Sequence, residues 1–506
     1  MKYPIKVLFL AAEANPFIKV GGLADVAGSL PHTLRPLRVR STIRSASANS
    51  DEIPAVDVRL VIPLHNAIRN RNLPLKVTTE FTIEHAQGPI PVQVFETDRN
   101  GMIVYLIASE LISDDEQLYH ADASQDGPKY TLFSLAALEL VRKLKWSPDV
   151  LHANDWHTAL AVYALDILRS SERFFKKSIS VLGLHNLPYL GVGAGDALAP
   201  FGLTPAYGSA LPWWAQDMPL PMGLLTANHI VTVSPGYAQE ILTPEYGSGL
   251  DEFLQSRSQD ITGILNGIEI QDWDPNSDLT LAANYSLDRL ESRRDNKAAL
   301  QNELGLPIDP DIPLLTMVTR LDPQKGVDLL PNALRQVADL AWQAVILGTG
   351  TPSLEGMMRA LETSFPDRLR AVVRFDSKLS RRIYSAADAI LIPSRYEPCG
   401  LTQMIAMRYG CIPIAHATGG LRDTIQDYAD FSHSTGFLFQ GATSENLGSA
   451  LRRALRVFSE RELWHAMQTR GMQKDFSWES SAKQYLDLYV SLITSYGKRK
   501  LQQVNK

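Results

Sequence analysis

Short apolar runs alternate with longer amphipathic segments along most of this chain, and this alternation limits the fold more than any other feature. The runs are rich in Val, Ile and Leu, and each is followed by a turn and a stretch of helical length. Continuous apolar runs of this kind are typical of parallel strands that helices cover on both faces. The pattern predicts a doubly wound α/β fold. The runs lie at residues 7–12, 58–62, 181–185, 230–234, 314–319, 344–348, 389–393 and 412–416.

A short motif that occurs twice in the chain predicts two such domains. The sequence "GGLAD" occupies residues 21–25 and "GGLRD" occupies residues 419–423, and each glycine pair stands between a predicted strand and a predicted helix. Either motif alone is typical of a tight turn. Two copies near opposite ends of a 506-residue chain favour two Rossmann-like domains that face a shared cleft. Each following helix would offer unpaired N–H groups to an anion. Residues 243–260 are the expected passage between the domains.

Composition and charge exclude several classes of protein. The chain has 49 basic and 55 acidic residues, a net charge of −6, so nucleic acid is not an expected partner. Its two cysteines, Cys399 and Cys411, build neither a disulfide framework nor a metal cluster, which fits a reducing compartment. The run at 7–12 is shorter than that of a signal peptide, and no uncharged stretch of about 20 residues could span a membrane. We expect a cytoplasmic protein without a membrane partner.

Two segments are predicted to lie outside the folded core. Residues 38–55 are rich in Ser and Arg and show no periodicity, which predicts an exposed loop. Residues 498–506 are polar and basic, which predicts a frayed tail.

One strand-to-helix turn carries an unusual set of side chains. The sequence "SRYEPCGLTQ" (394–403) follows the apolar run at 389–393 and precedes a helix predicted at 401–408. Proline and glycine punctuate turns, so turn chemistry alone is one interpretation. The other is that Glu397 binds a substrate, because ligands of open α/β sheets lie beyond the carboxyl ends of the strands.

A second turn offers two positive charges. In "VTRLDPQKGVDLL" (318–330), Arg320 stands at a strand end and Lys325 just before a predicted helix. A forked guanidinium and a compact ammonium suit a diphosphate. The alternative is a pair of surface residues balanced by neighbouring aspartates. Lys19, just ahead of Gly22 and its glycine partner, repeats the arrangement in the other half of the chain.

Polar clusters follow other predicted strands. In "HANDWHTAL" (152–160), His157 is the better candidate for a site, and His152 is interpreted as a structural group. His185 with Asn186, and Asn266 with Gly267, occupy similar positions after later strands.

Four other chemistries are not supported. The zinc motif HEXXH is absent, as are the glycine-rich phosphate loop of nucleoside triphosphatases and the GxSxG turn of hydrolases. Asp309 and Asp311 match the acid-x-acid pattern of metal-dependent sugar transferases, but prolines flank them and predict a turn. We therefore expect no metal site and no cofactor.

These motifs together resemble the bacterial glycogen synthase and plant starch synthase family, from Lys6 to about Tyr489. The resemblance rests on eight ordered stretches: "KVGGLADV" (19–26), "NDWHTAL" (154–160), "HNLPYLG" (185–191), "SPGYAQEILTPEYGSGLD" (234–251), "GILNGIE" (263–269), "TRLDPQKGVDLL" (319–330), "PSRYEPCGLTQ" (393–403) and "TGGLRDT" (418–424).

The resemblance implies a retaining hexosyltransferase of the GT-B fold. Such an enzyme transfers glucose from ADP-glucose to the non-reducing end of an α-1,4-glucan, by same-face attack that the leaving phosphate assists. Residues 1–255 would form the acceptor-side domain and 256–475 the nucleotide-sugar-binding domain. Residues 476–506 would supply a helix, at 479–489, that crosses back to the first domain, followed by the tail.

The resemblance also implies roles for individual residues. The catalytic set would be Glu397, His157, Arg320 and Lys325. Phosphate contacts would come from Arg320 and Lys325 again, and from Lys19, Gly22, Thr418, Gly419 and Gly420. Asn266 would bind the sugar beside Glu397 and His157, with Asp25 and Cys399 close by, and Phe375 would pack against the adenine.

Two alternatives stay open at this point. One is a GT-B transferase that uses UDP-glucose or a small oligosaccharide acceptor. The other is a catalytically silent glucan-binding scaffold, although such a scaffold has no need for a phosphate clamp. The chain also departs from relatives at Leu190, which stands where glutamine is common, at Lys129, which replaces an arginine, and along residues 187–214.

Overall fold

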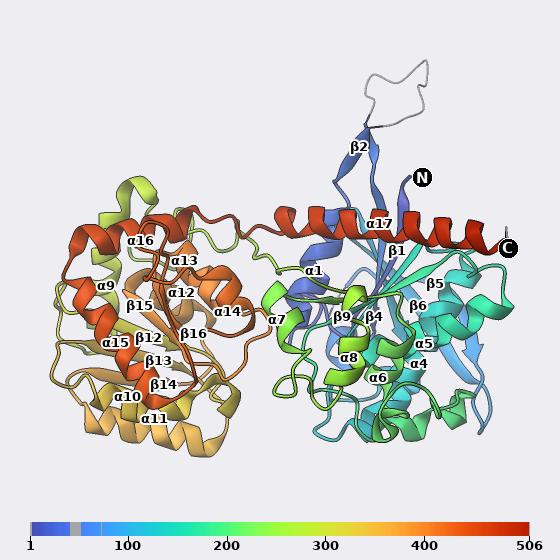
Figure 1. The fold of residues 1–506 in the computed structure, drawn as a ribbon, viewed down its shortest axis with the longest axis horizontal. Helices are drawn as coiled ribbons and strands as arrows, with labels where there is room; N and C mark the ends of the chain where they lie inside the picture. The colour runs from blue at the N-terminus through green and yellow to red at the C-terminus, as the bar shows by residue number, and fades with distance from the viewer. Residues whose placement is uncertain (1–2, 41–51, 72, 505–506) are drawn as a thin grey trace. The chain divides into compact units, whose positions relative to one another are not determined.

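The computed structural model describes residues 3–40, 52–71 and 73–504 of the chain (Figure 1). Its contacts separate two compact units. The first unit contains the residues up to Val233, Ala238–Leu265 and the C-terminal segment from Trp478. The second contains Ser234–Tyr237 and Asn266–Ser477. Residues 243–260, the expected passage, therefore belong to the first unit. The domain boundaries given above stay a prediction.

The first unit is built on a mixed sheet of nine strands among the described residues, in the order β11-β10-β9-β8-β1-β4-β7-β6-β5. From β11 to β7 all neighbours are parallel, and β6 and β5 add antiparallel strands at one edge. The strands are β1 (Ile5–Leu10), β4 (Val56–Pro63), β5 (Lys76–Ile83), β6 (Ile90–Arg99), β7 (Met102–Ala108), β8 (Val150–Asn154), β9 (Ile179–Leu184), β10 (His229–Thr232) and β11 (Ile261–Gly263).

Helices surround this sheet, and one of them comes from the far end of the chain. The helix α17 (Trp478–Val504) packs beside α1 (Figure 1). It buries Trp478, Tyr485 and Tyr489 in the same hydrophobic core as β1 and α1. The predicted return of the C-terminal helix is thereby confirmed. The helix extends through residues 498–504, so the frayed tail predicted there is wrong. The other helices of this unit are α1 (Gly22–Leu34), α2 (Asn66–Arg69), α3 (Glu110–Ser113), α4 (Ala123–Lys143), α5 (Asp155–Ser171), α6 (Pro219–Thr226) and α8 (Asp251–Ser256), and α7 (Pro235–Glu240) is shared between the units.

The second unit has a six-stranded, wholly parallel sheet among the described residues, in the order β14-β13-β12-β15-β16-β17. This is the Rossmann order 3-2-1-4-5-6, which confirms the doubly wound prediction. The strands are β12 (Leu314–Val318), β13 (Gln343–Gly348), β14 (Leu369–Val373), β15 (Ala389–Ile392), β16 (Ile412–His416) and β17 (Phe437–Phe439). The helices are α9 (Arg293–Glu303), α10 (Leu330–Arg335), α11 (Pro352–Ser364), α12 (Ser377–Ala386), α13 (Thr402–Arg408), α14 (Gly419–Thr424), α15 (Ser444–Phe458) and α16 (Arg461–Gln473).

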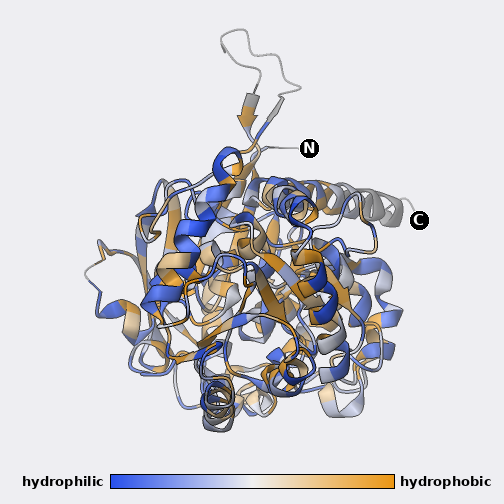
Figure 2. Ribbon diagram, turned by 90° about the vertical axis from the view of Figure 1, so that its left-hand side faces the viewer, coloured by the Kyte–Doolittle hydropathy of each residue, from blue (hydrophilic) through white to orange (hydrophobic). Residues whose placement is uncertain are grey.

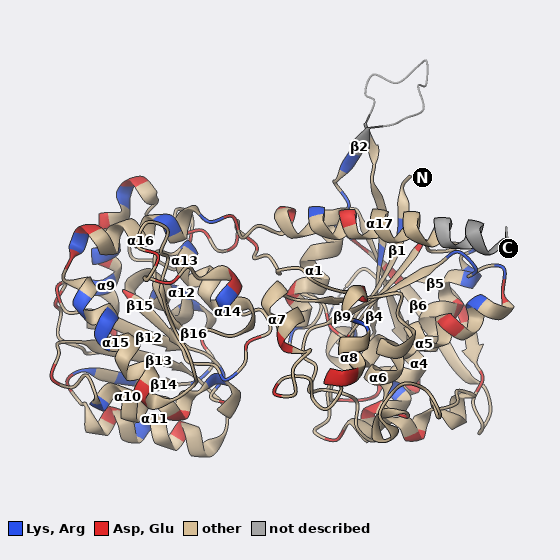
Figure 3. Ribbon diagram, in the orientation of Figure 1, with Lys and Arg blue, Asp and Glu red and all other residues tan. Residues whose placement is uncertain are grey.

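The parallel strands are continuous apolar runs because helices cover both of their faces. The strands are largely hydrophobic and the surrounding helices are mixed in character (Figure 2). Acidic and basic residues are interspersed over the helices of both units (Figure 3), in keeping with the small net charge. No helix within the described residues is long and apolar enough to cross a membrane.

The segment at 38–55 is not wholly a loop. Its two ends form the antiparallel pair β2 (Arg38–Arg40) and β3 (Glu52–Pro54), so the prediction of an irregular segment is wrong there. The ladder pairs Arg38 with Pro54 and Arg40 with Glu52. Residues 41–51 lie outside the described residues.

Candidate functional site

The second sheet reverses its strand order between β12 and β15, and a pocket lies at this point. Crossover connections run to opposite sides on either side of such a reversal, which leaves a crevice beyond the strand ends where ligands bind. The lining comes from the residue after β12, Thr319, the end of β15, Ile392, and the start of α13, Thr402 and Gln403. Lys325, Ser394 and Glu397 supply its polar wall.

Two predicted site residues meet directly in this pocket. Lys325 Nζ lies 2.9 Å from Glu397 Oε1 and 2.7 Å from Glu397 Oε2. The Ser394 hydroxyl donates to Glu397 Oε2 at 2.8 Å. The side chains of Lys325 and Glu397 are 18% and 12% exposed, so the pair is shielded from water but still open to a ligand. The ammonium has three donors, and a phosphate oxygen can therefore compete for it.

A second turn supports the turn that carries Glu397. Gly420 N–H donates to the backbone oxygen of Glu397 at 3.1 Å. A Cβ atom at Gly420 would lie 2.1 Å from the carbonyl oxygen of Cys399, so only glycine allows this approach. Gly419 has a φ of +41°, and Thr418 is buried at the start of α14. Five predicted site residues thus come together around the two turns.

Asn266 joins the same group through its backbone and leaves its side-chain oxygen unpaired. The backbone N–H of Asn266 donates to the Cys399 thiol, whose pKa is raised to about 12 by burial. Cys399 is therefore a neutral thiol near neutral pH. The buried Oδ1 of Asn266 has no hydrogen-bond partner among the described residues. Buried polar atoms are rarely left in this state, which suits an acceptor for a ligand hydroxyl.

Arg320 and Phe375 are held differently. The Arg320 side chain is exposed and makes no hydrogen bond or ion pair with any described residue. It directly follows Thr319 of the pocket lining. Phe375 is 85% exposed between β14 and α12. Both follow strand ends on the ligand-binding edge of the sheet, but neither is held against another site residue.

The first sheet has its own reversal of strand order, between β1 and β8. Glu13 follows β1 there, and its buried carboxylate accepts the backbone N–H of Val20 at 2.5 Å and of Gly21 at 3.1 Å. Burial raises the pKa of Glu13, and the two N–H donors and Tyr119 oppose that rise. The expectation that the first glycine pair offers unpaired N–H groups is therefore wrong for Gly21, because an acid of the same unit already uses that donor.

Lys19 and Asp25 also pair with each other. Their Nζ and Oδ1 atoms are 2.7 Å apart, and Lys19 remains mostly exposed. Gly22, exposed, begins α1 between them in sequence. A surface pair of this kind contributes little to stability, about 0–1 kcal/mol, so an anion can recruit the lysine at small cost.

His157 lies in the first turn of α5, among aromatic rings. The ring centroids of Trp156, Tyr119 and Tyr130 are 4.3 Å, 4.7 Å and 4.7 Å away. Burial, and then the charge of Lys129, hold the pKa of His157 well below its ordinary value, so the imidazole is neutral near neutral pH. Its Nδ1 is buried without a hydrogen-bond partner in the described part of the chain. A neutral imidazole of this kind can bond a substrate hydroxyl.

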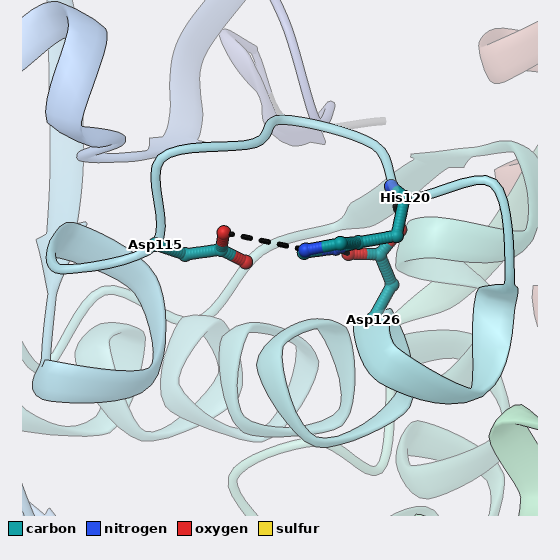
Figure 4. Close-up of side chains that lie close together, drawn as sticks. All are labelled: Asp115, His120 and Asp126. Atoms are coloured by element: carbon teal, nitrogen blue, oxygen red, sulfur yellow. Dashed lines mark hydrogen bonds and ion pairs between the residues drawn. The ribbon is translucent and has the colours of Figure 1, made fainter.

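A polar cluster around Lys129, whose charge acts on His157, has the residue types of a metal site. Asp115, His120 and Asp126 lie close together (Figure 4), with His120 Nδ1 at 2.8 Å from Asp126 Oδ1. The buried ammonium of Lys129 lies 2.7 Å from Asp126 and 2.8 Å from Asp115. This ammonium also donates to the backbone oxygen of Leu118 at 3.1 Å. Lys129 therefore supplies the positive charge here, and the cluster fixes the loop that carries Tyr119.

Sequence analysis missed two acids that shape the first unit. Asp155, at a φ of +54°, accepts the backbone N–H groups of His185, at 2.8 Å, and Asn186. Burial raises the pKa of Asp155 to about 7. Glu13 could have been found from its position directly after the first apolar run. Asp155 lies within the motif at 152–160, where the histidines were the candidates and this acid was not. His152 hydrogen-bonds the hydroxyl of Tyr489 at 2.6 Å in the core, as a structural group does.

Comparison with known proteins places this geometry in a family. Residues 6–256 match the starch synthase catalytic domain, and residues 302–471 match the glycosyl transferases group 1 domain. The glycogen synthase of Thermotoga maritima is 38% identical over 98% of this chain and 100% of its own length. The glycogen synthase of Clostridium perfringens is 35% identical over 97% and 98%.

The chain belongs to the glycogen and starch synthase family. A solved structure, the catalytic domain of starch synthase IV from Arabidopsis thaliana bound to ADP and acarbose, is 32% identical with a TM-score of 0.83 over 97% of this chain and 99% of that one. Membership makes the chain a glucosyltransferase of the glycogen and starch synthase type, and confirms the GT-B fold and the family expected from the motifs.

Proposed function

We propose that this enzyme transfers glucose from ADP-glucose to the non-reducing end of an α-1,4-glucan, with retention at the anomeric carbon. The observation that carries the proposal is the pair of Lys325 and Glu397 in the pocket at the ligand-binding edge of a Rossmann sheet. Asn266, whose side-chain oxygen is unpaired among the described residues, contacts Cys399 of the same turn. The starch synthase IV structure, which holds ADP and acarbose, supports the donor and acceptor classes.

The proposed roles in the second unit follow from charge and exposure. Lys325 and the unengaged Arg320 offset the negative charge that grows on the leaving ADP. Glu397 and Asn266 accept hydrogen bonds from glucose hydroxyls, and the Glu397 charge favours the oxocarbenium-like centre. The turn at Thr418, Gly419 and Gly420 contributes to phosphate binding, with Cys399 as its packed support. Phe375 packs against the adenine, since a ring 85% exposed is available for stacking.

The proposed roles in the first unit are positioning roles around the same reaction. His157 bonds a glucose hydroxyl as a neutral imidazole. Lys19, released from Asp25, contacts phosphate beside Gly22. The acceptor hydroxyl forms the new bond to the anomeric carbon as the bond to the ADP oxygen breaks, and its proton goes to the departing phosphate. Both cysteines are free and buried, which supports a cytoplasmic location.

One assay separates this proposal from its alternatives. Purified protein is incubated with glycogen and either labelled ADP-glucose or labelled UDP-glucose, and polymer-bound label is measured. We expect incorporation from ADP-glucose. Incorporation from UDP-glucose alone would show that UDP-glucose is the donor. Label found only on added maltooligosaccharides would show that the acceptor is a small oligosaccharide. Absence of incorporation from both donors, while a known synthase is active, would leave the silent scaffold.

A further inference from the structure

Two large aromatic side chains of the first unit project into solvent from one loop. Trp213 is 84% exposed and Tyr207 is 73% exposed, whereas most aromatic rings of the described residues are at least partly buried. Their loop, residues 204–216, follows the two short 3-10 turns that come after β9, and it ends just before α6. Exposed rings of this size cost solubility, and clusters of them mark binding surfaces.

The loop is fixed rather than loosely placed. The backbone N–H of Ala206 donates to the carbonyl oxygen of Gln216 at 2.7 Å, and that of Gly208 donates to Gln216 Oε1 at 3.2 Å. The Gln216 amide donates to the backbone oxygen of Leu211 at 3.0 Å. Gln216 thus ties the two residues that flank Tyr207 to the turn that carries Trp213. A rigid loop presents its rings without the entropy cost of ordering them on binding.

The loop is also anchored to the body of the unit. Tyr163 of α5 donates its hydroxyl to the backbone oxygen of Thr204 at 2.9 Å. Trp214 turns inward, where a Cβ atom at Gly249 would lie 3.0 Å from its ring. One of two adjacent tryptophans therefore supports the loop while its neighbour faces solvent.

The surrounding segment carries no charge. Residues 197–216 contain no Lys, Arg, Asp, Glu or His, whereas a stretch of this length would carry about four charged residues at the chain's average of 21%. A segment without charged side chains of its own offers no ionic contacts to nucleic acid, an acidic peptide or a lipid headgroup, and those ligands are recognised by such contacts. It suits a neutral ligand with flat apolar faces and many hydroxyls.

We infer that Tyr207 and Trp213 form a platform that binds the chain of a neutral α-glucan polymer, in addition to the site described above. Each ring stacks on the C–H face of a glucose residue, and the backbone and amide groups of the loop meet the hydroxyls. The choice of an α-glucan rests on the proposed function. The platform holds the polymer on the enzyme between transfers.

Affinity electrophoresis tests the platform without any reaction. The full chain, Trp213→Ala, Tyr207→Ser and the control Phe431→Ala are run in native gels with and without glycogen. Phe431 is exposed in the second unit and lies outside the platform. We expect glycogen to slow the parent and Phe431→Ala equally. Each platform variant should bind glycogen about tenfold more weakly, since truncating an anchoring aromatic typically costs more than 1 kcal/mol.

The outcomes are separable from those of the activity assay. If the parent is not slowed by glycogen, or if both platform variants are slowed as much as the parent, the platform is refuted even where the enzyme is active. Loss of slowing in the variants supports it even where no transfer is measured. A second copy of this chain is the other possible occupant, and sedimentation of the same proteins tests for it. A dimer that dissociates in Trp213→Ala would show that the rings bind this second copy.

Discussion

Each unit has a buried or nearly buried acid after a strand that borders the reversal of its strand order, yet the two acids have different kinds of partner. In the second unit, Glu397 follows β15 and pairs with the side chain of Lys325 in a pocket. In the first unit, Glu13 follows β1 and accepts backbone N–H groups from its own loop. A side-chain partner can be exchanged for a ligand, whereas a backbone partner fixes the chain. The second unit is thus arranged for charge chemistry and the first for shape.

The largest expected effect comes from removing the side-chain partner. Lys325→Ala should lower turnover by about 10²–10³, as loss of one preorganised charge contact does. It should also destabilise the second unit by about 1–3 kcal/mol, because Glu397 is left shielded and without its counter-charge. Steady-state kinetics and thermal melting measure the two effects.

Arg320→Ala is the matched control for that variant. Arg320 has no partner to abandon among the described residues, so turnover should fall by about the same factor while the melting temperature stays near that of the parent. If either variant melts far lower yet keeps its specific activity, these residues are structural and the assignment of the clamp is wrong. A Lys325→Ala, Glu397→Gln double variant should regain part of the lost stability.

Acid should affect the first unit more than the second. His65, His152, His185 and His229 all lie in the first unit, and burial lowers the pKa of each, to about 4, 3, 4 and 4. The unfolded chain binds protons on these rings below about pH 6.5 and the folded chain does not. Their contribution to stability is therefore complete above pH 6.5 and is lost as the pH falls towards 4. At pH 5, a ring with a pKa of about 4 would cost about 2 kcal/mol.

Asp155 acts with the opposite sign. Its pKa of about 7 means that the folded chain keeps a proton between about pH 4 and pH 7 that the unfolded chain has lost, so its contribution falls as the pH rises through that range. Hydrogen exchange at pH 7 and pH 5, corrected for intrinsic rates, compares the units. Greater loss of protection at pH 5 in the second unit would contradict this prediction. Asp155→Asn should enlarge the difference, because it removes the opposing group.

A smaller effect, on the KM for ADP-glucose, is expected from the loop of the first unit that joins β1 to α1. Glu13→Gln keeps one carbonyl acceptor but turns an NH₂ group towards the second backbone N–H, so Val20 and Gly21 cannot both be satisfied. Because Lys19 belongs to the same loop, the KM for ADP-glucose should rise about tenfold with a smaller change in kcat. Tyr119→Phe, which keeps the ring beside His157, should give part of that rise. An equal fall in kcat and unchanged KM would contradict a positioning role.

The two acids also show which features of the fold and of the site can be predicted from the sequence and which cannot. The doubly wound α/β fold followed from the periodicity, because buried parallel strands must be apolar, and the GT-B fold followed from the resemblance that the ordered motifs carry. The pairing of Lys325 with Glu397 could not be foreseen, since 72 residues separate them and only the fold brings them together. The use of Gly21 N–H by Glu13 was missed although the two residues are only eight positions apart, because the motif drew attention to the glycines and not to the acid that follows the first apolar run. The antiparallel pair of Arg38–Arg40 and Glu52–Pro54 was not predicted, because strands of three residues are too short to show a periodicity in the sequence.

The smallest expected effect, none at all, concerns metal removal in both units. In the second unit, Asp309 Oδ1 accepts the backbone N–H of Asp311 at 2.8 Å, which makes the acid-x-acid pair a turn before β12. In the first unit, Lys129 already places an ammonium between Asp115 and Asp126. Each unit thus satisfies its acids with its own donors.

Transfer from ADP-glucose should therefore proceed at the same rate after EDTA treatment and desalting. Loss of activity that manganese or magnesium restores would overturn the assignment, and Lys129→Met would then locate the ion. That variant frees the acids of Figure 4, so tighter binding of manganese by Lys129→Met than by the parent would identify the first unit as the metal site.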